Sequence, residues 1–129
     1  CSSDLIGHMS DNLDMDYQLE TLALGVYAAW DRMGLQGLAH CPMDDQRIPI
    51  LADLIRQGYH SQIMLSHDAI INWLGRPLSI PEAYLPLIEN WHPFHIFENV
   101  LPALAEKGTT EQQIQQMMVE NPRRLFEGE

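Results

Sequence analysis

Three short apolar runs divide the chain, and each ends at a polar or charged side chain. They lie at residues 5–6, 26–30 and 63–65. Short apolar runs bounded by glycine or charged residues are typical of buried strands in parallel sheets. The pattern predicts strands near residues 4–8, 25–31 and 62–68.

Apolar residues at helical spacing occupy the intervals between these runs. One loose stripe spans residues 12–24 and another spans residues 48–55. For the second stripe, the acidic residues 44–45 offer an N-cap and charges that suit the helix dipole, and Gly58 offers a stop. Because proline is tolerated only in the first turn of a helix, the sequence predicts a helix that starts close to Pro49.

The third run is followed by a segment without a sustained period. Residues 69–92 contain Gly75 and three prolines, and a long loop in a compact domain is usually functional. A helical stripe resumes over residues 94–104 and is closed by Gly108. Pro102 within it predicts a kink or a shifted helix start.

The last predicted helix has an explicit start. Thr110 and Gln113 form a capping-box pattern, and we expect Asn121-Pro122 to end the helix. The resulting order is strand, helix, strand, helix, strand, loop, helix, helix. This order predicts an α/β fold of successive βα units with parallel strands.

Composition narrows the class of protein. The 129 residues are 46% hydrophobic, which suits one domain's worth of chain with a sizeable core. The formal net charge of -11 argues against nucleic acid and anionic membrane as partners. Without an apolar stretch of the roughly 20 residues that span a bilayer, we expect a soluble, cytoplasmic protein. The start at Cys1 leaves open a truncated amino end.

The two cysteines suggest no metal site or redox pair. Cys1 and Cys41 lack the spacing of zinc ligands or of a redox motif. We expect free thiols, and a disulfide is the alternative.

Candidate chemistry gathers where the predicted strands end. In a βα array the carboxyl ends of all strands meet at one edge, so His8, Asp31, Arg32 and Asp68 should share a rim. Imidazole nitrogen and carboxylate oxygen are the ligands of catalytic zinc, which makes His8 and Asp68 candidate metal ligands.

Each of these residues also has an ordinary structural interpretation. His8 could be a hydrogen-bonded histidine at a strand end, and Asp68 could be an N-cap or a loop carboxylate. The adjacent Asp31 and Arg32 could form a local ion pair.

Other histidines and aromatic residues are weaker candidates. His67 precedes Asp68 and should point to the opposite side of its strand, which favours a structural role. Trp73 and Trp91, with Phe94, could line an apolar pocket under a loop or simply pack in the core. We interpret most of the remaining histidines as ordinary surface or loop residues: His40, His60, His92 and His95.

Taken together, several segments resemble the phosphotriesterase family of the amidohydrolase superfamily, and within it the carboxyl-terminal third. The closest likeness is to its lactonase-like and phosphotriesterase-related branch. The segments that carry the resemblance are Ile6-Gly7-His8 with Asp11 and Asp14-x-x-Tyr17, Gly25-Val26-Tyr27 through Trp30-Asp31-Arg32-Met33-Gly34-Leu35, Leu65-Ser66-His67-Asp68, Phe97-Glu98-Asn99 with Pro102, Leu104 and Gly108, and Val119 to Phe126.

The resemblance implies the last three βα units of a (β/α)8 TIM barrel, with residues 1–129 forming part of one domain. In the family a binuclear metal centre, usually two zinc ions, is held by an HxH motif, a carboxylated lysine, two further histidines and an aspartate. By motif position His8 matches the sixth-strand histidine. Asp68 matches the eighth-strand aspartate, a metal ligand that also acts as catalytic proton acceptor. No HxH motif or strand-ending lysine occurs in this sequence.

The resemblance also implies a substrate class. Arg32 stands where the dedicated organophosphate hydrolases carry a histidine, which favours a lactone or carboxylic ester, with phosphotriesters as a side activity. We expect Asp31, Arg32, Trp73 and Trp91 to contact this small molecule.

A second hypothesis is a non-catalytic barrel fragment or interaction module. Three βα units leave two sheet edges unpaired, so we expect a homo-oligomer or association with the rest of a barrel.

Overall fold

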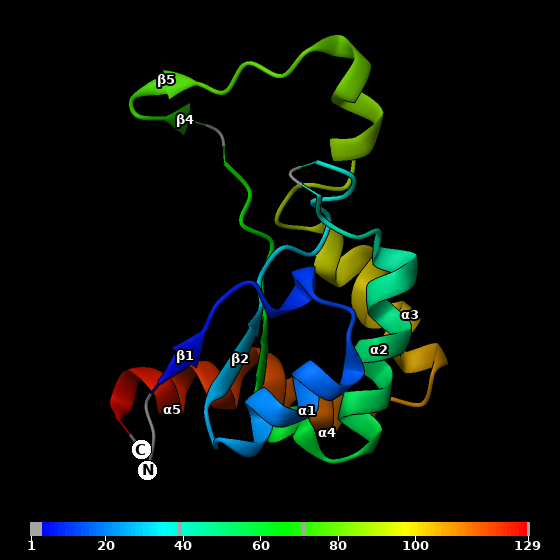
Figure 1. The fold of residues 1–129 in the computed structure, drawn as a ribbon, viewed down its shortest axis with the longest axis vertical. Helices are drawn as coiled ribbons and strands as arrows, with labels where there is room; N and C mark the ends of the chain where they lie inside the picture. Colours follow the sequence, from blue (N-terminus) through cyan, green and yellow to red (C-terminus); the bar gives the residue numbers. More distant parts are fainter. Residues whose placement is uncertain (1–3, 39, 71, 129) are drawn as a thin grey trace.

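A computed structural model describes residues 4–38, 40–70 and 72–128. Its centre is a three-stranded parallel sheet in the order β1-β2-β3, formed by Leu5–Ile6, Tyr27–Trp30 and Ile63–Leu65 (Figure 1). Leu5 pairs with Tyr27, and Trp30 pairs with Leu65. The three predicted strands and their parallel direction are confirmed.

Two helices connect the strands. Helix α1 spans Met15–Ala23, and the Asp14 side chain caps it by accepting hydrogen bonds from the backbone N–H groups of Asp16 and Tyr17. Helix α2 spans Asp44–Arg56. Gly58, which has a φ of 96°, lies just beyond its end and stops it. Short 3-10 turns at Met9–Asp11 and Tyr59–Ser61 complete the connections.

The start of α2 differs from the prediction. The helix begins at Asp44, so Pro49 lies in its second turn rather than near its start. Two acidic residues in the first turn suit the helix dipole, and the Gln46 side chain accepts the backbone N–H of Met43 at 3.1 Å. These contacts stabilise the early start, although Pro49 has no backbone N–H with which to donate a helical hydrogen bond.

Pro102 follows a wide helical turn. A π-helical turn at Ile96–Val100 precedes α3, Leu101–Glu106, so Pro102 falls in the first turn of α3. The sequence predicts a kink or a shifted start at Pro102; instead, the wide turn before Pro102 lets the helix continue through it. Gly108, with a φ of 95°, ends this helix as expected.

The last helix is longer than predicted. The capping box of Thr110 and Gln113 starts α4, Glu111–Gln115, as the sequence indicated. A π-helical turn at Gln116–Glu120 then leads into α5, Asn121–Glu127. Asn121-Pro122 therefore does not end the helix. Pro122 has no backbone N–H to donate, and the wide turn before it places it in the first turn of α5, where this donor is not required.

The hydrophobic core lies between one face of the sheet and the helices. Ala28 and Trp30 of β2 are fully buried on this face, whereas Ala29 points to the other face, beside Met64 of β3. The main helical contributors to the core are Leu22, Leu51, Leu54, Ile55, Ile96, Val100, Leu104 and Met117.

The long segment after β3 contains structure of its own. A hairpin is formed by β4, Asn72–Trp73, and β5, Arg76–Pro77, and a 3-10 helix spans Glu82–Ile88. Both stand beyond the carboxyl ends of the strands, at the top of Figure 1. We call residues 72–92 the lid segment. No helix in the described ranges is long and apolar enough to cross a bilayer.

Because the edges of the sheet are exposed, we expect the purified 129-residue chain to self-associate. Strands β1 and β3 are the outer strands, and Leu5 and Ile6 of β1 are 44% and 37% exposed. Unpaired apolar edges recruit other strands. In size-exclusion chromatography with light scattering, we expect a mass above the 14.8 kDa of one chain.

The variant Ile6→Lys should shift this distribution toward the monomer, because lysine on an edge strand opposes strand pairing. Leu24→Lys is the matched control, since Leu24 is 75% exposed and lies outside the sheet. A monomeric parent chain, or equal effects of the two variants, would contradict the prediction.

Candidate functional site

The residues that follow the three strands share one edge of the sheet, where two of them have unusual backbone conformations. His8 follows β1 with a φ of 59°, and Asp68 follows β3 with a φ of 47°. Residues other than glycine adopt such left-handed conformations rarely, and they concentrate at functional sites. The two candidate ligands therefore both occupy strained positions on the rim.

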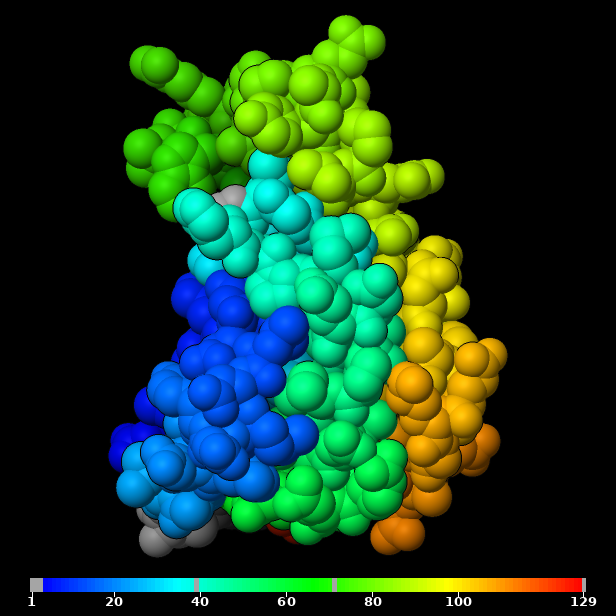
Figure 2. Space-filling view, turned by 45° about the vertical axis from the view of Figure 1, so that its right-hand side comes forward, coloured from blue at the N-terminus to red at the C-terminus, as the bar shows by residue number. Residues whose placement is uncertain are grey.

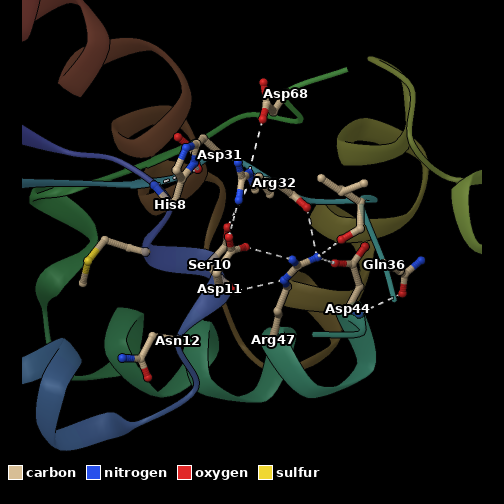
Figure 3. A network of polar contacts seen from close by, with 12 residues as sticks. His8, Ser10, Asp11, Asn12, Asp31, Arg32, Gln36, Asp44, Arg47 and Asp68 are labelled. Atoms are coloured by element: carbon tan, nitrogen blue, oxygen red, sulfur yellow. Dashed lines mark hydrogen bonds and ion pairs between the residues drawn. The ribbon is translucent and has the colours of Figure 1, made fainter. Parts of the chain in front are cut away.

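Asp31 orients His8 from the neighbouring strand. Its Oδ1 accepts the backbone N–H of His8 at 3.0 Å and lies 3.1 Å from the His8 Nδ1. A carboxylate beside Nδ1 favours the tautomer with a proton on that nitrogen, which leaves Nε2 with a free lone pair. Asp31, predicted as a substrate contact, thus lies against the imidazole of His8 (Figure 3).

Arg32 links Asp68 to Asp11, which lies in the connection between β1 and β2. Its Nε donates to Asp68 Oδ2 at 3.2 Å, and its NH1 donates to Asp11 Oδ2 at 2.6 Å. Burial lowers the pKa of Arg32, but hydrogen bonds to the two carboxylates outweigh it and raise the pKa above the ordinary value. Arg32 therefore stays charged and fixes one oxygen of Asp68 (Figure 3).

A second arginine lies beneath this pair. Arg47 of α2 has a fully buried side chain, and its NH2 donates to Asp11 Oδ1 at 3.3 Å. Its NH1 donates to Asp44 Oδ1 at 2.9 Å. The guanidinium also donates to three backbone carbonyls, which are those of Ser10, Arg32 and Leu35.

Asp44 links Arg47 to a buried histidine. Asp44 Oδ2 lies 2.7 Å from His95 Nε2 and accepts the backbone N–H of Gly34 at 2.9 Å. Burial raises the pKa of Asp44, but hydrogen bonds from His95 and Arg47 outweigh this and lower it below its usual range. The interpretation of His95 as an ordinary surface or loop histidine is therefore wrong, since its side chain is only 5% exposed.

The two predicted tryptophans differ in their surroundings. The Trp91 Nε1 donates to the backbone carbonyl of His67 at 2.9 Å, and its ring lines a cavity within the lid segment. Trp73 is 58% exposed in β4. His67 Nδ1 accepts the backbone N–H of Ala69 at 3.0 Å, a structural contact. The expected substrate contacts of both tryptophans stay predictions.

The donor atoms on the rim suit a metal ion, although they do not complete a site. His8 Nε2 and Asp68 Oδ1 have no hydrogen-bond partner among the described residues, while the second nitrogen or oxygen of each group is held by Asp31 or Arg32. Orientation of a ligand through its second atom is usual in metal sites. No group of three or more potential ligands occurs in the described part of the chain.

Sequence reasoning missed the supporting residues below the rim. In the sequence, Asp11 stands out only as part of the family resemblance and Asp44 only as a charge at a helix start, and no pattern singles out Arg47. Their burial depends on contacts between segments far apart in sequence, which no local spacing reveals. The only local signal for His95 is Asn99 one helical turn later, whose Nδ2 lies 3.0 Å from its Nδ1.

Cys41 lies beside this network, where its thiol interacts with the Asp11 carboxylate. It is a buried free thiol, and burial raises its pKa, which disfavours the reactive thiolate. Cys1 lies outside the described residues.

Comparison with known proteins identifies the family. The sequence profile of the phosphotriesterase family matches residues 1–126. The chain belongs to the phosphotriesterase family. Two curated relatives of this family member are a "Phosphotriesterase homology protein" of Mycobacterium tuberculosis and an "Aryldialkylphosphatase" of Saccharolobus solfataricus. The first is 38% identical over 123 residues and the second 34% over 124.

Solved structures confirm the fold class. The organophosphorus hydrolase of Deinococcus radiodurans is 51% identical with a TM-score of 0.89, and the match covers 95% of this chain and 37% of that one. A mutant of a PTE-like lactonase from the same organism is 50% identical with the same score. This phosphotriesterase-family chain is thus an α/β fold of parallel strands that matches part of a TIM barrel.

The chain spans little more than a third of the curated relatives it matches. The matches cover 95% of this chain but 36% of the mycobacterial protein and 38% of the Saccharolobus protein. The expected correspondence to about one third of a family member agrees with these shares.

We expect the free energy of unfolding to fall in acid because of Asp44. Because the folded state lowers the pKa of Asp44, this carboxylate stabilises the fold above its unfolded pKa of about 4. This stabilisation is lost as the pH falls through the lowered pKa of Asp44 in the folded state. Protonation then removes the negative charge that His95 and Arg47 face. Urea unfolding between about pH 6 and pH 3 should show the decline.

Asp44→Asn should lower the free energy of unfolding by about 3 kcal/mol at neutral pH, because it removes the closer of the two carboxylate partners of the buried Arg47. It should also flatten the decline below about pH 4. Asp45→Asn is the control, since Asp45 is the exposed neighbour in the same helical turn. Parallel pH profiles for the parent and Asp44→Asn would contradict this assignment.

Proposed function

We propose that the protein containing this chain is a metal-dependent hydrolase that attacks a lactone or another carboxylic ester, with phosphotriesters as secondary substrates. The observation that carries the proposal is the pairing on the rim. His8 and Asp68 each present one free donor atom, while Asp31 and Arg32 hold the other. Such an arrangement serves a metal ligand better than a simple surface contact.

His8 Nε2 and Asp68 Oδ1 would bind the metal, which we expect to be zinc, with two ions in the complete site. When bound, the metal lowers the pKa of water to about 7 and polarises the substrate carbonyl or phosphoryl oxygen. Further ligands would come from residues outside the described part of this chain, because catalytic zinc sites use about three protein ligands.

Other residues of this chain would orient the two candidate ligands and accept a proton. Asp31 keeps His8 in the tautomer that leaves Nε2 free, and Arg32 keeps the Asp68 carboxylate aimed at the rim. Asp68 would accept the proton from the attacking water. Arg32 cannot take this proton onward, because a guanidinium remains charged at all working pH values.

Support for the ester and lactone class comes from the relatives. The similar Deinococcus structure is described as a PTE-like lactonase, whereas the Saccharolobus relative is named aryldialkylphosphatase. Both names describe hydrolysis of an ester bond. One water-activating metal site serves both reactions, because attack at carbonyl carbon or at phosphorus uses the same nucleophile and the same polarised oxygen.

Removal of a proposed ligand tests the metal site. In the full-length protein, Asp68→Asn should lower kcat/KM for lactone hydrolysis by about 10³-fold or more, and His8→Ala should lower bound zinc, measured by elemental analysis. Asp45→Asn serves as the control, because it neutralises an exposed carboxylate away from the rim. Unchanged zinc content and turnover in Asp68→Asn would contradict the proposal.

The preferred substrate needs a separate measurement. We expect kcat/KM for a lactone to exceed that for a dialkyl aryl phosphate by about tenfold or more, a ratio that corresponds to 1.4 kcal/mol in transition-state binding. Paraoxon-type phosphates and a series of lactones of increasing chain length supply the comparison. A reversed ratio would assign the phosphotriester as the main substrate.

A non-catalytic barrel module is the second candidate, favoured by the lack of a third ligand among the described residues. The two candidates differ in metal content. Full-length protein that holds no zinc, even after dialysis against it, would favour the module and remove the hydrolase.

A further inference from the structure

The lid segment is closed at its base. The Trp91 Nε1 donates to the backbone carbonyl of His67 at 2.9 Å, so the residue next to Asp68 contacts the far end of the segment. Between these points the lid folds around an open pocket whose lining side chains are mostly apolar. The cavity is lined by Ile70, Leu78, Ser79, Ile80, Leu85, Ile88 and Trp91.

The lid segment rests on the loop that follows β2. A Cβ atom placed on Gly34 would lie 2.1 Å from the backbone oxygen of Asn90, and one on Gly37 would lie 3.3 Å from the side chain of Leu87. Only glycine permits so close an approach of the two backbones. Figure 2 shows the lid packed against this loop over a continuous surface.

One carboxylate holds these two pieces together. Asp44 Oδ2 accepts the backbone N–H of Gly34 from below the loop and lies 2.7 Å from the His95 Nε2, just after the lid. Both side chains are more than nine-tenths buried. Asp44 thus contacts the loop and the chain just after the lid through the same oxygen atom.

The other oxygen of Asp44 leads to the rim. Asp44 Oδ1 accepts from Arg47, Arg47 donates to Asp11, and Asp11 accepts from Arg32, the residue that holds Asp68. An unbroken series of charged contacts therefore joins the base of the lid to the candidate metal ligand. Figure 3 shows this series from Asp44 to Asp68.

We propose that Asp44 and His95 form a clasp that sets the position of the lid segment over the rim, and that they are positioning residues for substrate selection. The proposal rests on the hydrolase function proposed above. A clasp at the base fixes the cavity within the lid relative to Asp68. Substrates that extend from the reacting bond into the lid should therefore depend on the clasp, and substrates too short to reach it should not.

Two variants of His95 separate the hydrogen bond from the packing. In His95→Gln the amide Nε2 can occupy the place of the imidazole Nε2 and donate to Asp44, whereas His95→Phe keeps an aromatic ring without a donor. For a long-chain lactone we expect His95→Phe to raise KM by about tenfold, because small misplacements of binding groups are costly. For a short, unsubstituted lactone we expect less than about twofold change in KM and kcat, and His95→Gln should restore the long-chain value.

A second pair of variants displaces the lid without changing a polar group. Gly34→Ala would bring a Cβ atom against Asn90, whereas Gly58→Ala is a matched control with a similar φ of 96° and no atom within 4 Å. Gly34→Ala should reproduce the length-dependent rise in KM, and Gly58→Ala should not.

Hydrogen exchange supplies a readout that does not require activity. In full-length protein, His95→Phe should speed exchange in residues 72–92 while α1 keeps the exchange of the parent protein. Faster exchange throughout the sheet and helices would overturn the proposal, because Asp44 and His95 would then only support the fold.

The kinetic outcomes are equally distinct. Equal effects of His95→Phe on long and short lactones, or no effect on either, would overturn the clasp. A parent protein that hydrolyses neither lactone would remove the proposed function instead, and the exchange measurement would still test the clasp.

Discussion

The buried guanidinium of Arg47 is the interaction on which the arrangement of the rim depends. A cation removed from water is costly unless every donor finds an acceptor. Arg47 meets this requirement with acceptors from the first connection, from the loop after β2 and from its own helix. Because three of these acceptors are backbone carbonyls, the charge fixes the course of the chain as well as the side chains. A path that moved these carbonyls away from Arg47 would leave some of its donors unpaired.

This constraint accounts for the unusual conformations at the rim. His8 and Asp68 both have positive φ values, which cost of order 1–3 kcal/mol each when adopted by residues other than glycine. Such conformations persist only where the surroundings determine them. The contacts of Asp31 with His8 and of Arg32 with Asp68 hold the two side chains, and Arg47 holds the backbone from which Asp11 and Arg32 project. The strain at the rim is thus offset by the buried network below it.

The sequence was sufficient where local pattern decides the structure. Apolar runs located the three strands, and their parallel order brought the predicted His8, Asp31, Arg32 and Asp68 to one edge. It failed where a distant contact outweighs a local preference. The helix that contains Pro49 begins early, and one of its first residues, Asp44, binds partners 10 and 51 residues away. In the last helix, a wide turn accommodates a proline that local rules treat as a stop.

The residues that support the rim and the candidate metal ligands on it are distributed differently along this chain. Every partner of Arg47 lies between residues 10 and 47, so the residues that shape the rim are complete within one stretch. The candidate metal ligands do not form a complete set among the described residues, which offer two donors where a catalytic zinc would need about three. Changes in the support can therefore alter the position of Asp68 or of the lid without changing the number of ligands. The metal binding and the substrate selection that we propose would thus depend on separable sets of residues, one at the strand ends and one buried beneath them.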